Sequence, residues 1–171
     1  MQERLSKIKL LALDVDGVLT DGTINIGDNG ELFKGFNAKD GLGISCALRS
    51  GLNIAIITGR KSEIIHKRAG ELGITLLCEG VKDKYAELVR LTEEMNFTQE
   101  QVAYMGDDIP DYEVLQRCGL PCCPSDAAHE IKSICKYISH KEGGKGCVRD
   151  IVEQILKAQN LWMHNSAAFG W

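Results

Sequence analysis

Residues 8–20 read IKLLALDVDGVLT, an apolar run that ends in Asp14, Asp16 and Gly17. A continuous apolar run is typical of a strand that is covered on both faces of a parallel sheet. Ligands of such sheets bind in a crevice at the carboxyl ends of the strands. The stretch therefore predicts an α/β fold in which the carboxylates of Asp14 and Asp16 project into a binding crevice.

The rest of the chain continues this alternation of strands and helices. Strands are predicted over residues 53–58, 74–78, 101–105, 120–122 and, at an edge, 137–139. Helices are predicted over residues 40–50, 62–72, 83–95, 110–118 and 147–159, with Ser62 as the N-cap of the second. This order favours one doubly wound, Rossmann-like parallel sheet in a single domain spanning residues 1–171.

Two segments depart from the pattern. Residues 23–36 alternate in character around Asp28-Asn29-Gly30, which indicates a β-hairpin inserted after the first strand. Residues 161–171 have no clear period and are predicted to form a C-terminal tail.

Composition excludes several classes of protein. The net charge of −4 does not suggest the basic face of a nucleic-acid-binding protein. No apolar run reaches the roughly 18 residues of a membrane span. The first ten residues lack the apolar core of a signal peptide, so we expect a cytoplasmic protein. The seven cysteines match no zinc-site spacing and are interpreted as reduced, mostly buried thiols.

A second acidic cluster, Gly106-Asp107-Asp108, follows the strand predicted over 101–105. Carboxylates that converge at neighbouring strand ends repel one another unless a cation lies between them. Mg²⁺ prefers one or two carboxylates together with other oxygen ligands. We therefore predict a magnesium site formed by Asp14, the backbone carbonyl of Asp16 and Asp107, with Asp111 orienting these ligands from the next helix.

Two further segments suggest phosphate binding. Thr58-Gly59-Arg60 ends the strand over 53–58 and offers a hydroxyl, backbone N–H groups and a guanidinium. Lys84 begins a helix, where its ammonium group can neutralise a transferring phosphoryl group, and Lys82 is the alternative. Each motif alone is weak, since a solvated turn, a helix cap or a surface lysine explains it equally well.

Taken in order, DVDGVLTDG, ITGR, GVKDK and GDD resemble the haloacid dehalogenase superfamily. The hairpin ending in KGFNAKDGLGI, AIITGRKSEI, QVAYMGDDIPD and GGKGCVRD is similar to its cap-less branch, which contains phosphatases of 3-deoxy-D-manno-octulosonate 8-phosphate. The resemblance implies an Asp14 nucleophile that forms an aspartyl phosphate, and an Asp16 general acid and base. It also implies phosphate binding by Thr58, Gly59 and Lys84, and support of the Mg²⁺ cofactor by Asp108.

The resemblance also carries expectations about substrate and assembly. The substrate is expected to be a small phosphorylated sugar acid used in lipopolysaccharide biosynthesis, with Arg60 and Arg68 as anion-binding candidates. A homotetramer is expected to form through the hairpin over 23–36. Two alternatives stay open: a nonulosonate 9-phosphate as the substrate, and a non-catalytic tetramerising partner of a cytidylyltransferase.

Overall fold

The core of the protein is a six-stranded, fully parallel sheet. A computed structural model describes residues 1–164. The strands are β1 (Leu10–Leu13), β4 (Asn53–Thr58), β5 (Leu76–Glu79), β6 (Val102–Met105), β7 (Leu120–Cys123) and β8 (Tyr137–Ile138). Their order in space is β5-β4-β1-β6-β7-β8, so the chain winds outward in both directions from β1. The predicted doubly wound sheet is confirmed, including the edge position of β8.

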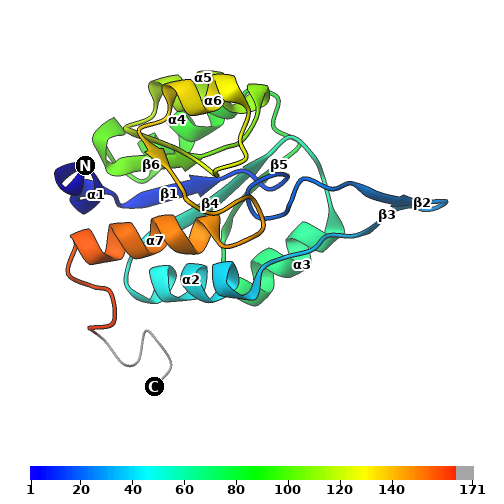
Figure 1. The fold of residues 1–171 in the computed structure, drawn as a ribbon, viewed down its shortest axis with the longest axis horizontal. Helices are drawn as coiled ribbons and strands as arrows, with labels where there is room; N and C mark the ends of the chain where they lie inside the picture. Colours follow the sequence, from blue (N-terminus) through cyan, green and yellow to red (C-terminus); the bar gives the residue numbers. More distant parts are fainter. Residues whose placement is uncertain (165–171) are drawn as a thin grey trace.

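Helices cover both faces of the sheet. They are α1 (Gln2–Lys7), α2 (Ala38–Arg49), α3 (Glu63–Leu72), α4 (Lys84–Glu94), α5 (Tyr112–Arg117), α6 (His129–Ile134) and α7 (Cys147–Ala158), with short 3₁₀ turns η1 (Gln99–Gln101) and η2 (Ile109–Asp111). Figure 1 shows α2, α3 and α7 below the sheet and α4, α5 and α6 above it. Successive residues of a strand point to opposite faces, so Leu11 and Leu13 pack toward α7, whereas Leu10 and Ala12 pack toward α4.

Several predicted boundaries differ from those observed. The helix predicted over residues 110–118 is divided into η2 and α5, with Pro110 in the first turn of η2. The six-residue helices α1 and α6 were not predicted, because so short a segment carries too few turns for a clear helical period. Ser62 directly precedes α3 as predicted, but its hydroxyl donates to Glu31 rather than capping the helix.

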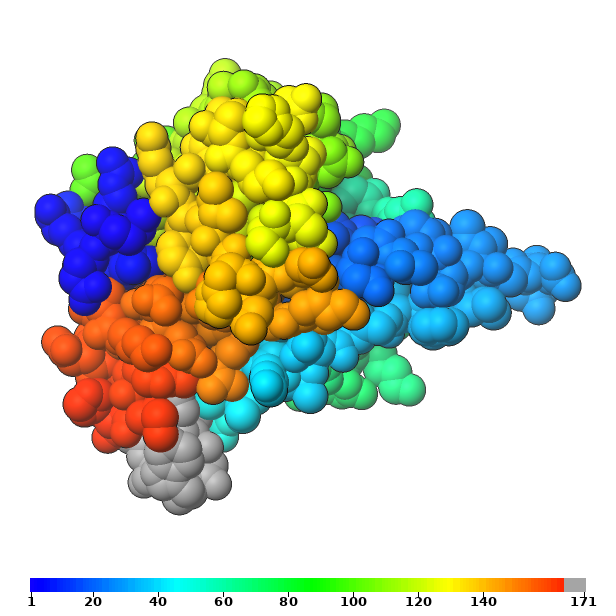
Figure 2. Space-filling view, viewed as in Figure 1, coloured from blue at the N-terminus to red at the C-terminus, as the bar shows by residue number. Residues whose placement is uncertain are grey.

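A β-hairpin follows the loop after β1, as predicted. Strands β2 (Asn25–Gly27) and β3 (Gly30–Phe33) pair in antiparallel fashion and form a sheet of their own. The hairpin extends away from the body of the protein (Figures 1 and 2). Its side chains Ile26, Leu32 and Phe33 are 71%, 62% and 58% exposed. Within residues 1–164 no second folded unit covers the carboxyl ends of the strands.

The C-terminal end of the described chain folds back onto α7. The backbone N–H groups of Leu161 and Trp162 both donate to the carbonyl of Leu156, and the Trp162 ring lies 4.8 Å from the guanidinium carbon of Arg149. Of the predicted tail over 161–171, residues 165–171 lie outside the described residues. No helix in the described part of the chain has the length and apolar character needed to cross a membrane.

Candidate active site

The pairing of β1 with β6 brings the two acidic clusters together. Leu13 lies opposite Met105 in the parallel register, so the residues that follow each strand emerge side by side. The Asp14 N–H donates to the carbonyl of Met105 at 3.0 Å, which joins the two strand ends. Asp14 and Asp107 therefore face one pocket at the carboxyl end of the sheet, as the sequence predicted.

Eleven residues line this pocket: Asp14, Asp16, Gly22, Thr58, Gly59, Arg60, Lys84, Asp107, Asp108, Pro110 and Asp111. They come from the ends of β1, β4 and β6, from the start of α4 and from η2. Segments far apart in the sequence thus supply carboxylates, a hydroxyl and cations to one small space.

Lys84 is held between two carboxylates. Its ammonium nitrogen lies 2.8 Å from Asp14 Oδ2 and 2.7 Å from Asp111 Oδ1. Burial alone would lower the pKa of Lys84, but the charges of Asp14 and Asp111 outweigh burial and raise it, so the ammonium group keeps its charge. Lys82, the predicted alternative, is exposed. Lys84 is therefore the lysine of this pocket.

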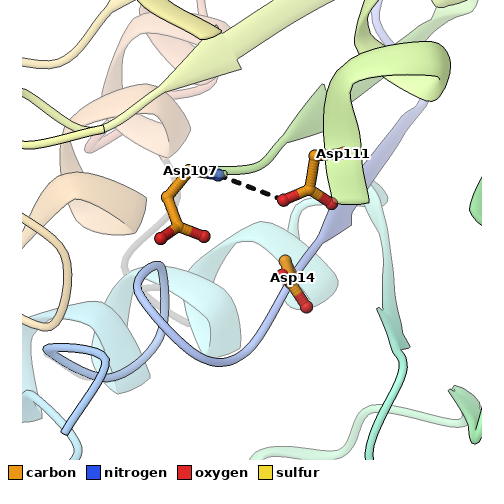
Figure 3. A group of neighbouring side chains, drawn as sticks. All are labelled: Asp14, Asp107 and Asp111. Carbon is orange, nitrogen blue, oxygen red and sulfur yellow. Dashed lines mark hydrogen bonds between the residues drawn. The ribbon is translucent and has the colours of Figure 1, made fainter. Parts of the chain in front are cut away.

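Asp111 organises the base of the site. Besides Lys84, its Oδ1 accepts the Tyr104 hydroxyl at 2.7 Å, and its Oδ2 accepts the Asp107 N–H at 3.2 Å (Figure 3). Both carboxylate oxygens are thus already occupied by donors, and the side chain is 1% exposed. Asp111 is placed to orient Lys84 and the Asp107 backbone rather than to bind a ligand itself.

A cation fits between Asp14 and Asp107. Oxygens of Asp14, Asp107 and Asp111 lie within 4.8 Å of one another (Figure 3). Burial, together with the neighbouring carboxylates, raises the pKa of both Asp14 and Asp107 to about 7. Two neighbouring carboxylates repel each other when both are ionised, and a divalent cation between them removes this repulsion. Mg²⁺ accepts such paired carboxylates as ligands.

The backbone of Asp16 completes this candidate metal site. Its carbonyl oxygen accepts no hydrogen bond from any described residue, which leaves the oxygen available as the predicted third ligand. The chain turns directly after it at Gly17, where φ is +85°. A side-chain Cβ at Gly17 would lie 1.9 Å from Asp107 Oδ2, so only glycine lets this loop approach Asp107 so closely.

The Asp16 carboxylate points to different partners. Its Oδ1 lies 2.6 Å from Lys34 Nζ, and its Oδ2 lies 3.6 Å from Arg60 Nε. The predicted ligation of the metal by Asp16 therefore uses its backbone carbonyl, while its side chain contacts Lys34 and Arg60 instead. Lys34 was missed by sequence reasoning, because a lysine at the end of a hairpin reads as a solvated charge.

The end of β4 supplies the predicted phosphate-binding group. Thr58 is buried, and its Oγ1 accepts the Arg60 N–H at 3.4 Å, so its own hydroxyl hydrogen remains free to donate to a ligand. Gly59 and Arg60 are exposed at the pocket rim, as is Asp108 on the opposite side. The structure therefore brings together all the predicted phosphate-binding residues.

Arg68 lies elsewhere in this chain. It projects from α3 toward Phe36, with its guanidinium carbon 5.5 Å from the ring centroid, and its Nη1 lies 3.3 Å from Glu71. Arg68 lines a separate, narrow cavity between α2 and α3, and not the pocket that contains Asp14. Its predicted role in substrate binding gains no support from this position.

The segment 143–147 supports the loop after β1 from behind. The Gly144 N–H donates to the Val18 carbonyl at 2.9 Å, and the Cys147 thiol donates to the same carbonyl. A side chain at Gly143 would lie 1.9 Å from the Gly17 carbonyl oxygen. The late motif GGKGCVRD thus packs against the backbone that carries Asp14 and Asp16.

The chain is similar to known proteins in sequence and in structure. Residues 77–151 match the model of the haloacid dehalogenase-like hydrolases. The 3-deoxy-D-manno-octulosonate 8-phosphate phosphatase of Salmonella typhi is 43% identical over 156 residues, which cover 91% of this chain and 83% of that protein.

Two solved structures are similar along nearly the whole chain. The 3-deoxy-D-manno-octulosonate 8-phosphate phosphatase from Yersinia pestis superposes with a TM-score of 0.93 at 40% identity, covering 95% of this chain and 88% of the other. The corresponding phosphatase from Moraxella catarrhalis, solved with a magnesium ion, a phosphate ion and a KDO molecule, gives a TM-score of 0.90 at 40% identity and covers 93% and 91%. The chain therefore belongs to the haloacid dehalogenase-like hydrolases and, within them, to the family of 3-deoxy-D-manno-octulosonate 8-phosphate phosphatases.

Proposed function

We propose that this protein is a magnesium-dependent phosphatase that removes the phosphate from 3-deoxy-D-manno-octulosonate 8-phosphate through an aspartyl phosphate on Asp14. The observation that carries the proposal is the meeting of Asp14, Asp107 and Lys84 in one pocket that Thr58 also lines. The relatives named above act on this sugar acid phosphate, and one of them was solved with magnesium, phosphate and KDO.

In the proposed first step, an oxygen of Asp14 attacks phosphorus, and the bond from phosphorus to the sugar oxygen breaks. Lys84 neutralises charge on the phosphoryl oxygens, while Asp111 holds its ammonium group in place. The Thr58 hydroxyl donates to another phosphoryl oxygen. Mg²⁺ would be held by Asp14, Asp107 and the Asp16 carbonyl, with Asp108 beside them. When bound, it would supply positive charge next to the phosphoryl group.

Asp16 moves the proton in both steps. Its carboxyl group gives a proton to the departing sugar oxygen, which leaves as an alcohol. The resulting carboxylate then takes a proton from the water that attacks the phosphorus of the aspartyl phosphate. Phosphate is released, and Asp14 and Asp16 return to their starting states.

Arg60 is proposed to bind the carboxylate of the sugar acid. It lies at the exposed rim of the pocket, with its Nε 3.6 Å from Asp16 Oδ2, where its guanidinium is accessible to an anion. A planar guanidinium suits a carboxylate because it donates two parallel hydrogen bonds.

Assembly and location are part of the same proposal. The hairpin exposes the apolar side chains of Ile26, Leu32 and Phe33 on its two faces, which supports contact with another subunit. A homotetramer through the hairpin is the assembly that we propose. All seven cysteines are free thiols, which supports a reducing, cytoplasmic location. The reaction would then serve lipopolysaccharide biosynthesis.

A panel of substrates tests the proposed specificity. Values of kcat/KM are measured for 3-deoxy-D-manno-octulosonate 8-phosphate, a nonulosonate 9-phosphate and simple sugar phosphates, all with Mg²⁺. The proposal predicts a preference for the octulosonate ester of at least about tenfold, or ~1.4 kcal/mol. Equal or greater efficiency on the nine-carbon ester would move the assignment to that substrate. Failure to hydrolyse any ester would favour a scaffold.

A further inference from the structure

Lys34 is a buried cation that has no role in the reaction proposed above. It follows β3 at the base of the hairpin, and its side chain is only 2% exposed. Its Nζ lies 2.6 Å from Asp16 Oδ1 and 2.9 Å from Glu31 Oε1. A lysine is rarely buried unless its charge is paired, so the two carboxylates stabilise this ammonium group inside the protein.

The contact with Asp16 fixes one of its two carboxylate oxygens. Lys34 binds Oδ1 on the hairpin side, so Oδ2 is left on the side of Arg60, which lines the pocket. Without such a partner, the last side-chain bond of an aspartate has a broad torsional preference that fixes neither oxygen. Proton transfer requires the donor oxygen to lie within hydrogen-bond reach of the reacting group, so this orientation matters for the reaction.

A chain of polar contacts anchors Lys34 to the body of the protein. Glu31 Oε1 contacts Lys34, while its Oε2 accepts the Ser62 hydroxyl just before α3. The Ser62 N–H in turn donates to Glu79 Oε1 at 3.0 Å, at the end of β5. Through these contacts the central sheet holds the base of the hairpin, and the base of the hairpin holds Asp16.

We propose that Lys34 is a positioning residue that holds the Asp16 carboxylate in the orientation required for proton transfer. The inference rests on the proposed function only in requiring that Asp16 transfers the proton, and it does not depend on which sugar is the substrate. It also gives the hairpin a part in the chemistry of its own subunit, in addition to any part in assembly.

The expected loss can be bounded from the role of Asp16. General acid–base catalysis contributes about 10²–10⁴-fold to a reaction rate. Lys34→Met removes the ammonium group but keeps the aliphatic stem, so Asp16 remains present and loses the cation that pairs with it and orients it. We expect the step that releases a sugar alcohol to slow by about 10- to 100-fold, which is part of that contribution.

Two substrates separate a misplaced Asp16 from a damaged site. A sugar alcohol needs a proton in order to leave, whereas the nitrophenolate of 4-nitrophenyl phosphate leaves without one. With enzyme in excess and Mg²⁺ present, release of the leaving group in a single turnover reports the attack by Asp14 alone. Release of phosphate then reports hydrolysis of the aspartyl phosphate, for which Asp16 activates water with either substrate.

For Lys34→Met we expect nitrophenolate release to stay within about threefold of the wild type, while sugar release and both phosphate releases slow by about 10- to 100-fold. Lys34→Arg retains a cation and is expected to recover much of the loss. Glu31→Gln leaves Lys34 paired with Asp16 and is expected to have a smaller effect. Lys132→Met removes a partly buried lysine that donates to the Ser125 carbonyl and does not line the pocket, and it serves as the control.

Three results would overturn the inference: nitrophenolate release slowed as much as sugar release, no step slowed, or no recovery in Lys34→Arg. If Lys34→Met does not fold, the Glu31→Gln/Lys34→Met double variant removes the paired charges together and is subject to the same comparison. Failure of the proposed function is distinguishable, because then the wild type itself would show no Mg²⁺-dependent release of either leaving group.

Discussion

Replacing Gly17 with alanine tests the contact between the loop after β1 and the proposed metal ligand Asp107. The backbone at Gly17 has φ +85°, so alanine there costs about 1–2 kcal/mol in conformational strain alone. The new Cβ would also lie 1.9 Å from Asp107 Oδ2 and 2.3 Å from Asp107 Cγ. Ordinary contact begins near 3.4 Å, so the carboxylate or the loop must move by roughly 1.5 Å.

Gly51→Ala supplies the matched control. Gly51 has a nearly identical φ of +88°, and no atom lies within 4 Å of the position that a Cβ would take there. It therefore carries the same backbone strain without touching the site. Gly51→Ala should lose about 1–2 kcal/mol of the free energy of unfolding in urea titrations, and Gly17→Ala should lose at least as much, because the clash with Asp107 adds to the same strain.

Only Gly17→Ala should alter the chemistry. A displacement of about 1 Å at a reacting site can cost about 10²-fold in rate. We therefore expect Gly17→Ala to lower kcat by about 10²-fold and to require at least about tenfold more Mg²⁺ for half-maximal activity. Activity is measured against Mg²⁺ concentration for both variants under conditions where each is folded. Identical Mg²⁺ dependence in the two variants would refute the reasoning.

Three further predictions follow from the site and the hairpin. Because the pKa values of Asp14 and Asp107 are raised from 3.8 to about 7, these groups hold protons below pH 7 that the unfolded chain releases. The metal-free protein should therefore lose the stability contributed by these two protonated carboxyl groups as pH rises from 3.8 to about 7. Because the same groups must lose their protons to bind Mg²⁺, binding should release protons, and the affinity should fall by at least about tenfold from pH 8 to pH 6. Calorimetry in buffers of different ionisation enthalpy measures the Mg²⁺ affinity and the number of protons released. An affinity that does not depend on pH would contradict the prediction. Tyr104→Phe removes the hydroxyl that donates to Asp111 and should lower the free energy of unfolding by about 1.5–3 kcal/mol, whereas unchanged urea unfolding would count against that bond. Leu32→Asp places a charge on the exposed hairpin and should reduce the particle mass in light scattering from that of the proposed tetramer. An unchanged mass would count against assembly through the hairpin.

The fold could be predicted from the sequence because its strands are continuous apolar segments that end in polar residues. The predicted strand over 53–58 coincides with β4, and the hairpin forms around the predicted turn. The short helices α1 and α6 escaped prediction because their six residues make fewer than two turns. The hydroxyl of Ser62 was predicted to cap α3, but a tertiary partner, Glu31, competes for it.

Less of the site could be predicted from the sequence. The positions of the strand ends predict which residues lie close together, but they do not predict which side chains contact one another. Asp14, Lys84 and Asp107 could be assigned to one pocket because each directly follows a strand or begins a helix at the same edge. The contact of Lys34 with Asp16 depends on how the hairpin folds back, which no local pattern encodes. The position of Arg68 beside Phe36 likewise depends on how α3 packs against the segment that enters α2.

The central claim is that Asp14 becomes phosphorylated during turnover. The protein is mixed with 3-deoxy-D-manno-octulosonate 8-phosphate and Mg²⁺, quenched in acid and reduced with borohydride, which converts an aspartyl phosphate into homoserine. Mass analysis of the peptide that contains residue 14 then reads the outcome directly. We predict homoserine at position 14 in the wild type and none in Asp14→Asn. Trapping at another residue, or steady phosphate release by Asp14→Asn, would contradict the account.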